Sequence, residues 1–268
     1  MVGDTTRRET VTGGVTILHM TGAYLSQEFY RERNARELDF RNISGTHGYC
    51  DEEAKVVLQE RLANISHEGI HFLDSGNYHY LSLFFLRKIT EPFSLVVFDH
   101  HPDLQRPAFG AVTSCGGWVR EALETLPNLQ QVCLIGPEED SIRMLLDEAG
   151  EDGTDAWIRE ADKVCWDGNA LVRELPLYLS FDKDVLREQD CLCDWDQGTM
   201  SLAEAKGLLS ELLREHRLLG VDICGEESRW ETREGPEGEK IRRINDRTNR
   251  ELLEFLEQRI TNPTKNQE

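Results

Sequence analysis

Short apolar runs and amphipathic stretches alternate along this chain, and their order predicts the fold. The apolar runs have the length of buried strands, whereas the stretches between them place apolar residues at helical spacing. Because parallel strands need crossover connections, this order indicates an α/β protein with a mainly parallel sheet. The expected strands are 15–20, 70–73, 95–98, 131–135, 177–181 and 219–224, and the expected helices are 51–65, 114–126, 140–149 and 202–216.

The chain changes character after the last expected strand. Residues 227–240 are rich in charge and predict an exposed loop, and residues 262–268 predict a frayed tail. Between them, residues 241–260 carry apolar side chains at helical spacing and predict an amphipathic terminal helix. Because α/β chains of 268 residues are often one domain, we expect residues 1–268 to form a single domain.

Three potential metal ligands stand where the apolar run 95–98 ends. Asp99, His101 and Asp103 occupy alternate positions, so on an extended chain they point to one side, while His100 points away from them. Carboxylates crowded in this way repel one another and resist burial unless a cation is present. The pattern therefore predicts a divalent metal site at the end of this strand.

Two further segments extend the predicted site. The run 177–181 ends in Asp182 and Asp184, and the run 70–73 leads through a Gly-Asn turn to His79. Ligands collect at the carboxyl ends of parallel strands, so these side chains should meet Asp99, His101 and Asp103. Four carboxylates and two imidazoles fit two divalent ions, with Mn²⁺ preferred and Zn²⁺, Fe²⁺ or Co²⁺ as alternatives.

The same three segments resemble motifs of the arginase and agmatinase (ureohydrolase) superfamily. Residues 99–103, DHHPD, are similar to its D-A-H-x-D motif; residues 180–184, SFDKD, to S-x-D-x-D; and residues 76–80, GNYHY, to G-G-x-H-S. The resemblance implies a three-layer α/β/α sandwich, as in arginases and deacetylases, with a binuclear manganese centre. It further implies that Asp99 and Asp182 bridge the ions. His79 and Asp103 would complete one site, and His101 and Asp184 the other.

Departures from the family pattern concern the recognition of arginine. The glutamate of the family's D-x-x-E motif falls one position late, at Glu226, and no Asn-Pro follows it. Val119 stands where arginases carry a proton-shuttling histidine, and Arg187 and Glu188 replace the third acid of the S-x-D-x-D-x-x-D motif. The chain therefore resembles a divergent member of the superfamily that lacks the arginine-specific residues.

These residues predict an enzyme that hydrolyses a C–N bond of guanidino, formimino or amide type with metal assistance. Asp103, Asp184 and Glu226 are the expected catalytic residues. Asp103 or Asp184 is expected to accept a proton, and Glu226 is expected also to contact a cationic part of a small substrate. Asn77 and Cys115 are further candidates for substrate contact. Two alternatives stay open: a deacetylase-like amidohydrolase with a single zinc ion, and a metal-binding protein of arginase fold without catalytic activity.

Composition narrows the range of partners and locations. A net charge of −20 opposes binding to nucleic acid and mildly favours cationic small molecules, although acidic surfaces also serve solubility. No run of eighteen apolar residues and no secretion signal is present, so we expect no membrane contact and a cytoplasmic location. Reduced thiols are expected for the seven cysteines, with Cys133 and Cys224 as small core residues. The resemblance also allows a homo-oligomer.

Overall fold

The computed structural model describes residues 13–106, 112–150, 162–229 and 235–261, and its centre is an eight-stranded sheet. Within these residues the strand order is β2-β1-β4-β10-β9-β5-β7-β8, and each recorded pairing in this sheet is parallel. The strands are β1 (Val15–His19), β2 (Arg36–Asp39), β4 (Ile70–Phe72), β5 (Phe93–Phe98), β7 (Leu129–Ile135), β8 (Val164–Cys165), β9 (Leu177–Asp182) and β10 (Leu218–Cys224). The predicted parallel α/β fold is confirmed.

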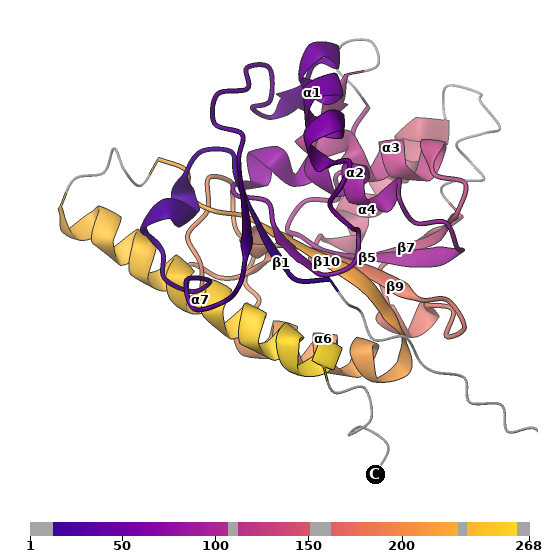
Figure 1. Cartoon of the computed structure of the whole chain (residues 1–268). Helices are drawn as coiled ribbons and strands as arrows, with labels where there is room; N and C mark the ends of the chain where they lie inside the picture. The colour runs from indigo at the N-terminus through magenta and orange to yellow at the C-terminus, as the bar shows by residue number, and fades with distance from the viewer. Residues whose placement is uncertain (1–12, 107–111, 151–161, 230–234, 262–268) are drawn as a thin grey trace, which may run out of the picture.

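Helices cover both faces of the sheet and complete the three layers (Figure 1). One face carries α1 (Glu52–Leu62), α2 (Ser82–Leu86), α3 (Trp118–Thr125) and α4 (Glu139–Gly150), and the other carries α6 (Leu202–Glu215) and α7 (Pro236–Thr261). Alternate residues of β5 enter different cores: Leu95 and Val97 pack on the first face, and Val96 and Phe98 on the second. A strand buried on both faces explains why this segment is apolar throughout.

The direction in which the chain crosses the sheet changes around the central strands. From β1 the chain first adds β2 at one edge, whereas β7 and β8 extend the sheet at the opposite edge. In the middle, the register places Cys224 beside Asp182 and Phe98 beside Phe181, so three strands end at one level. In open parallel sheets, ligands bind at the carboxyl ends of strands near such reversals. The topology therefore places the predicted ligands where a crevice is expected.

Several short elements are absent from the sequence prediction. These are β2, β8 and a separate antiparallel pair formed by β3 (Tyr49–Cys50) and β6 (Thr113–Ser114). The helix expected from residue 114 begins only at Trp118, because Ser114 belongs to β6 and Cys115–Gly117 forms a 3₁₀ turn. Two-residue strands show no period that a sequence pattern could reveal.

The prediction of an exposed loop over residues 227–240 is wrong at both ends of this range. Glu227 is buried, and α7 begins at Pro236, so the last five residues of that range are helical. Proline suits the first turn of a helix, where its missing N–H has no intrahelical acceptor, and Glu237 and Glu239 complement the helix dipole there. Residues 230–234 and the expected tail 262–268 lie outside the described residues.

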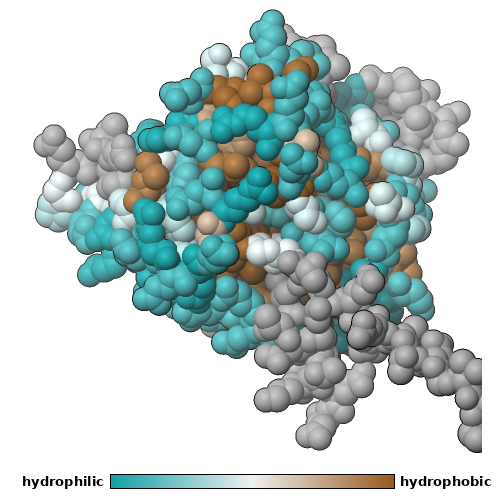
Figure 2. Space-filling view, in the orientation of Figure 1, coloured by the Kyte–Doolittle hydropathy of each residue, from teal (hydrophilic) through white to brown (hydrophobic). Residues whose placement is uncertain are grey.

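The surface drawn in Figure 2 is mainly hydrophilic. On the face drawn in Figure 2, hydrophilic residues cover most of the surface, and apolar ones show mainly in the gaps between them. Of the helices that the structure describes, none combines the length and the apolar character needed to cross a membrane.

Candidate metal centre

His79 and three aspartates form the first of two clusters at the ends of the central strands. His79 lies on the 3₁₀ helix η2 (Gly76–Leu81), which follows β4 and is capped by the Ser75 side chain. Its Nδ1 atom is 3.0 Å from Asp99 Oδ2, 3.3 Å from Asp103 Oδ2 and 3.6 Å from Asp182 Oδ2. All four side chains are buried. Three carboxylates thus converge on one imidazole nitrogen.

The second cluster lies beside the first and shares Asp99 with it. His101 Nδ1 is 2.9 Å from Asp184 Oδ2 and 3.5 Å from Asp99 Oδ1. Asp99 therefore turns one carboxylate oxygen toward each histidine. The ligand atoms of His79, Asp99 and Asp103 lie within 4.8 Å of one another, and so do those of Asp99, His101 and Asp184. The structure brings all six predicted ligands together.

The surroundings of His79 fit a metal ligand. Its Nε2 atom is 2.8 Å from Ser180 Oγ, but its buried Nδ1 has no hydrogen-bond partner of acceptable geometry among the described residues, despite the nearby carboxylates. When Nε2 donates to Ser180, Nδ1 carries a lone pair that faces three carboxylates. Such a second hydrogen bond commonly orients metal-binding histidines. A cation between these atoms would satisfy the nitrogen and the carboxylates together.

Burial and mutual repulsion make these carboxylates costly to ionise. Burial, followed by the charges of neighbouring aspartates, raises the pKa of Asp182 and that of Asp184 to about 7. Burial also raises the pKa of Asp103. Hydrogen bonds to Asp184 and Asp99 raise the pKa of His101 to about 11. The metal-free cluster therefore favours protonated carboxyls, and a bound divalent cation would offset the same repulsion.

The metal-free protein is expected to lose stability as the pH rises from about 5 to about 8. The carboxyls of Asp182 and Asp184 have an ordinary pKa of 3.8 but titrate near 7 in the fold, so the folded state holds more protons across this range. Urea unfolding of chelator-treated protein at both pH values checks this, and Asp182→Asn should flatten the dependence. Added Mn²⁺ or Zn²⁺ should stabilise more at the higher pH, where fewer protons compete. Greater metal-free stability at the higher pH would contradict the account.

Two glycines allow the chain to pass close to Asp182. A Cβ atom on Gly76 would lie 2.8 Å from Asp182 Oδ2, and one on Gly225 would lie 2.3 Å from Asp182 Oδ1. Gly225 also has φ +87°, a conformation that side chains disfavour. Together these glycines bring η2 and the end of β10 against the central carboxylate.

Asp103 is held in position by its backbone and by a tryptophan. Its φ of +51° lies in the left-handed region, which is uncommon for residues other than glycine. The buried Trp118 donates from Nε1 to Asp103 Oδ2 at 2.7 Å. Sequence reasoning did not single out Trp118, because nothing in the pattern of α3 distinguishes it from a core residue.

A pocket of about 380 Å³ opens above the two clusters. Its floor contains all six predicted ligands, and Asn77 and Cys115, the candidates for substrate contact, line its wall. The exposed Trp195 and Arg106 also line it, although the sequence prediction omitted both. The Trp195 ring lies edge-on to His101, 6.0 Å away between centroids. Loop residues such as these follow no periodic pattern, so the sequence alone does not predict that they line the pocket.

The loop after β9 supports η2 through Asp194. Asp194 Oδ2 accepts hydrogen bonds from Ser75 Oγ at 2.7 Å and from Asn77 Nδ2 at 3.3 Å. Asp196, two residues further along the same loop, is exposed and does not line the pocket. Asp194 therefore holds the segment that carries His79.

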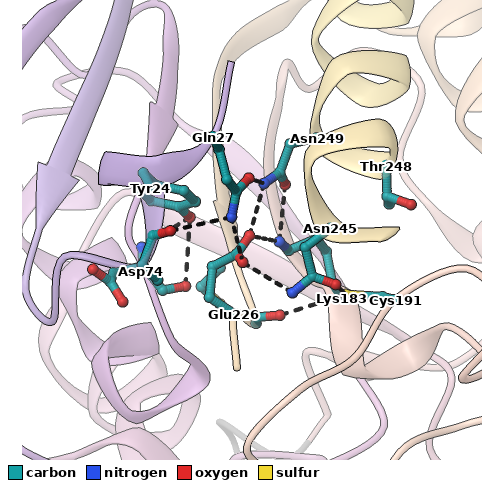
Figure 3. A network of polar contacts seen from close by, with 12 residues as sticks. Tyr24, Gln27, Asp74, Lys183, Cys191, Glu226, Asn245, Thr248 and Asn249 are labelled. Atoms are coloured by element: carbon teal, nitrogen blue, oxygen red, sulfur yellow. Dashed lines mark hydrogen bonds and ion pairs between the residues drawn. The ribbon is translucent and has the colours of Figure 1, made fainter. Parts of the chain in front are cut away.

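Glu226 does not lie where the sequence prediction placed it. It is buried in a polar network behind the pocket, where it pairs with the buried ammonium of Lys183 (Figure 3). It also accepts hydrogen bonds from Gln27 (2.9 Å), Asn245 (2.9 Å) and Asn249 (2.7 Å). With its oxygens engaged there, Glu226 is not placed to contact a substrate or to act catalytically, which corrects both expectations. The reason is Lys183, which stands between two ligands, is buried behind them and requires a counterion.

Comparison with known proteins identifies a related sequence and related folds. No established family model matches the chain. An uncharacterized protein from Thermotoga maritima is 34% identical over 194 residues, which cover 69% of this chain and 72% of that protein.

Among solved structures, proclavaminate amidinohydrolase from Streptomyces clavuligerus has a TM-score of 0.60 at 16% identity, covering 92% of this chain and 91% of its own. Formimidoylglutamase from Bacillus subtilis has a TM-score of 0.56 at 14% identity, covering 95% and 88%. Arginase from Bacillus cereus has a TM-score of 0.55 at 12% identity, covering 91% and 97%. The chain therefore belongs to one family with the Thermotoga maritima protein and has the arginase and agmatinase (ureohydrolase) fold.

Proposed function

We propose that this protein is a hydrolase that uses two divalent metal ions to cleave a non-peptide C–N bond of a small molecule. The observation that supports this most directly is the pair of ligand clusters that share Asp99 on the floor of one pocket. Solved structures with the same fold include proteins named for amidino and formimino hydrolysis. A pocket of about 380 Å³ suits a small substrate.

The six side chains divide into two sets of ligands in this proposal. His79, Asp99, Asp103 and Asp182 would hold one ion, and Asp99, His101 and Asp184 the other. The resemblance to the superfamily motif implies that Asp182 would also bridge the ions. Mn²⁺ is the proposed ion, with Zn²⁺, Fe²⁺ or Co²⁺ as alternatives. Bound there, divalent ions would lower the pKa of a water molecule and polarise the substrate.

The protein's own groups would position the substrate and move protons. Asp103 and Asp184 both line the pocket, so either would be placed to accept a proton during hydrolysis. Trp118 keeps Asp103 Oδ2 in place, and His101 does so for Asp184 Oδ2. Asn77 and Cys115 would contact the substrate from the wall. A small molecule is the proposed partner, and the net charge of −20 disfavours nucleic acid.

A non-catalytic metal-binding role is the second candidate. Glu226 is engaged in a buried network, and Val119 is buried in the core, so the arginine-specific groups are missing from the pocket. A deacetylase-like enzyme with a single zinc ion needs only one set of ligands, whereas this protein has two clusters that share a carboxylate. The deacetylase-like function is therefore the weakest of the three candidates.

Turnover by the metal-loaded protein separates these functions. The protein should release urea, formamide, ammonia or a carboxylate from at least one compound in a panel of guanidino, formimino and acylated amines. An Asp184→Asn variant should lose this activity by about a hundredfold or more, because proton transfer and ligation both suffer. Lack of turnover by protein carrying two ions would favour the non-catalytic role, and turnover of acylated amines with one zinc ion would favour the deacetylase-like enzyme.

A further inference from the structure

Cys224 stands next to the metal centre, although the pattern of its own strand predicts a small core residue. It is the last residue of β10, and the parallel register places it directly beside Asp182 at the end of β9. Its thiol donates to Asp182 Oδ2, with the sulfur 3.2 Å from the oxygen. Its sulfur, the carboxylate of Asp182 and a ring nitrogen of His79 lie within 4.8 Å of one another.

We propose that Cys224 is a thiolate ligand of the ion that His79 and Asp182 hold. The inference rests on the proposed metal centre and adds to it a ligand that the six residues do not include. On binding, a sulfur–metal bond forms and the thiol proton passes to solvent, as cysteine ligation requires.

A second observation points to a cation at this place. The Nδ1 atom of His79 is buried and has no hydrogen-bond partner among the residues that the structure describes. Typical zinc distances are about 2.3 Å to sulfur and about 2.0 Å to nitrogen, so tetrahedral ligands of one ion lie about 3.3 to 3.8 Å apart, with a few tenths of an ångström of adjustment on binding. The Asp182 to Cys224 and Asp182 to His79 separations of 3.2 Å and 3.6 Å fit this range with that adjustment.

The position of Cys224 favours ligation over contact with a substrate. Its side chain is buried and does not line the pocket, so its sulfur would approach the ion from behind Asp182. Gly225 makes this approach possible, because a Cβ there would collide with Asp182 Oδ1 and the Lys183 backbone. A cysteine that attacked a substrate would instead need its sulfur exposed on the pocket wall.

A sulfur ligand has a consequence for metal choice. Thiolates favour softer ions, so this ion site should prefer Zn²⁺, Co²⁺ or Fe²⁺ to Mn²⁺, whereas the site at His101 keeps only oxygen and nitrogen ligands. The chain would then bind two ions of different preference. Cys224→Ser should lower the affinity for Zn²⁺ by at least about tenfold and change the affinity for Mn²⁺ much less.

Cobalt absorption tests the proposal. Co²⁺ added to the full-length metal-free protein should give a sulfur-to-cobalt charge-transfer band in the near ultraviolet together with visible ligand-field bands. Cys224→Ser should lose the charge-transfer band and keep the ligand-field bands. Cys133→Ser, which changes another buried strand cysteine, should keep both.

The outcomes distinguish a failure of the Cys224 proposal from a failure of the proposed metal centre. Ligand-field bands without a charge-transfer band in the unaltered protein would overturn the role of Cys224 and leave the metal centre standing. A charge-transfer band that survives Cys224→Ser would assign the sulfur to another cysteine. Failure to bind Co²⁺ would overturn both proposals. X-ray absorption of the unaltered zinc-loaded protein, which needs no variant, should show sulfur at about 2.3 Å.

Discussion

Asp99→Ala is expected to abolish high-affinity binding of both metal ions. Asp99 is the one residue that belongs to both the His79 cluster and the His101 cluster of the described residues, and each of its oxygens faces a different histidine. Its loss leaves each ion with an incomplete ligand set and removes a negative charge that offsets the two cations. Loss of a supporting partner alone lowers metal affinity by about 10- to 100-fold, so loss of a shared ligand should exceed that range.

Calorimetric titration of chelator-treated protein with Mn²⁺ and with Zn²⁺ measures this effect. Asp196→Ala is the matched control, because Asp196 is an exposed aspartate outside all the clusters described above. The control should bind metal as the unaltered protein does. If Asp99→Ala retained two tightly bound ions, the assignment of Asp99 as the shared ligand would be wrong.

Lys183→Met is expected to lower the free energy of unfolding by about 3–5 kcal/mol. The Lys183 ammonium is buried with Glu226 and also donates to Asn249 Oδ1 at 2.8 Å. Removing it leaves the Glu226 carboxylate without a counterion in the interior. Asn249 lies on α7, and Lys183 lies between the ligands Asp182 and Asp184. The variant should therefore also remove a contact that connects α7 to the metal centre.

Urea denaturation measures the free energy of unfolding of this variant and of Lys206→Met, which breaks an ion pair at the surface. Lys206 Nζ lies 2.9 Å from Glu251 Oε2, but both side chains are partly exposed, so Lys206→Met should cost less than about 1 kcal/mol. The double variant Lys183→Met/Glu226→Gln should recover much of the lost stability, because no buried charge then remains unpaired. Equal effects of the two single variants would show that the buried pair contributes no more than the surface pair.

The metal ligands were predictable because they directly follow buried parallel strands, although the ligand segments themselves are not extended: Asp103 has φ +51° and Asp184 lies on a 3₁₀ turn. Asp99, His101 and Asp103 follow an apolar run at alternate positions, and Asp182 and Asp184 follow another. Parallel strands end on one edge of a sheet, and the two sets meet there because β9 pairs directly with β5. The prediction of His79 as a ligand depended only on a short turn that keeps the chain at the carboxyl end of β4, and η2 forms this turn.

The supporting residues were not predictable, because they depend on packing between distant segments. The resemblance to the family's D-x-x-E motif predicts that Glu226 contacts a substrate, but its partners Gln27 and Asn249 are 199 and 23 residues away. Cys224 was interpreted as a small core residue from its own strand. Its contact with Asp182 depends on the neighbouring strand and on the register between the two. Single-strand periodicity contains neither kind of information.

Metal content of the unaltered protein tests the central claim most directly. The protein should be incubated with Mn²⁺ or Zn²⁺, freed of excess ion and analysed for metal per chain. The two clusters around Asp99 predict about two ions per chain. One ion per chain would contradict the binuclear centre, and none would show that the six converging side chains do not form a metal site.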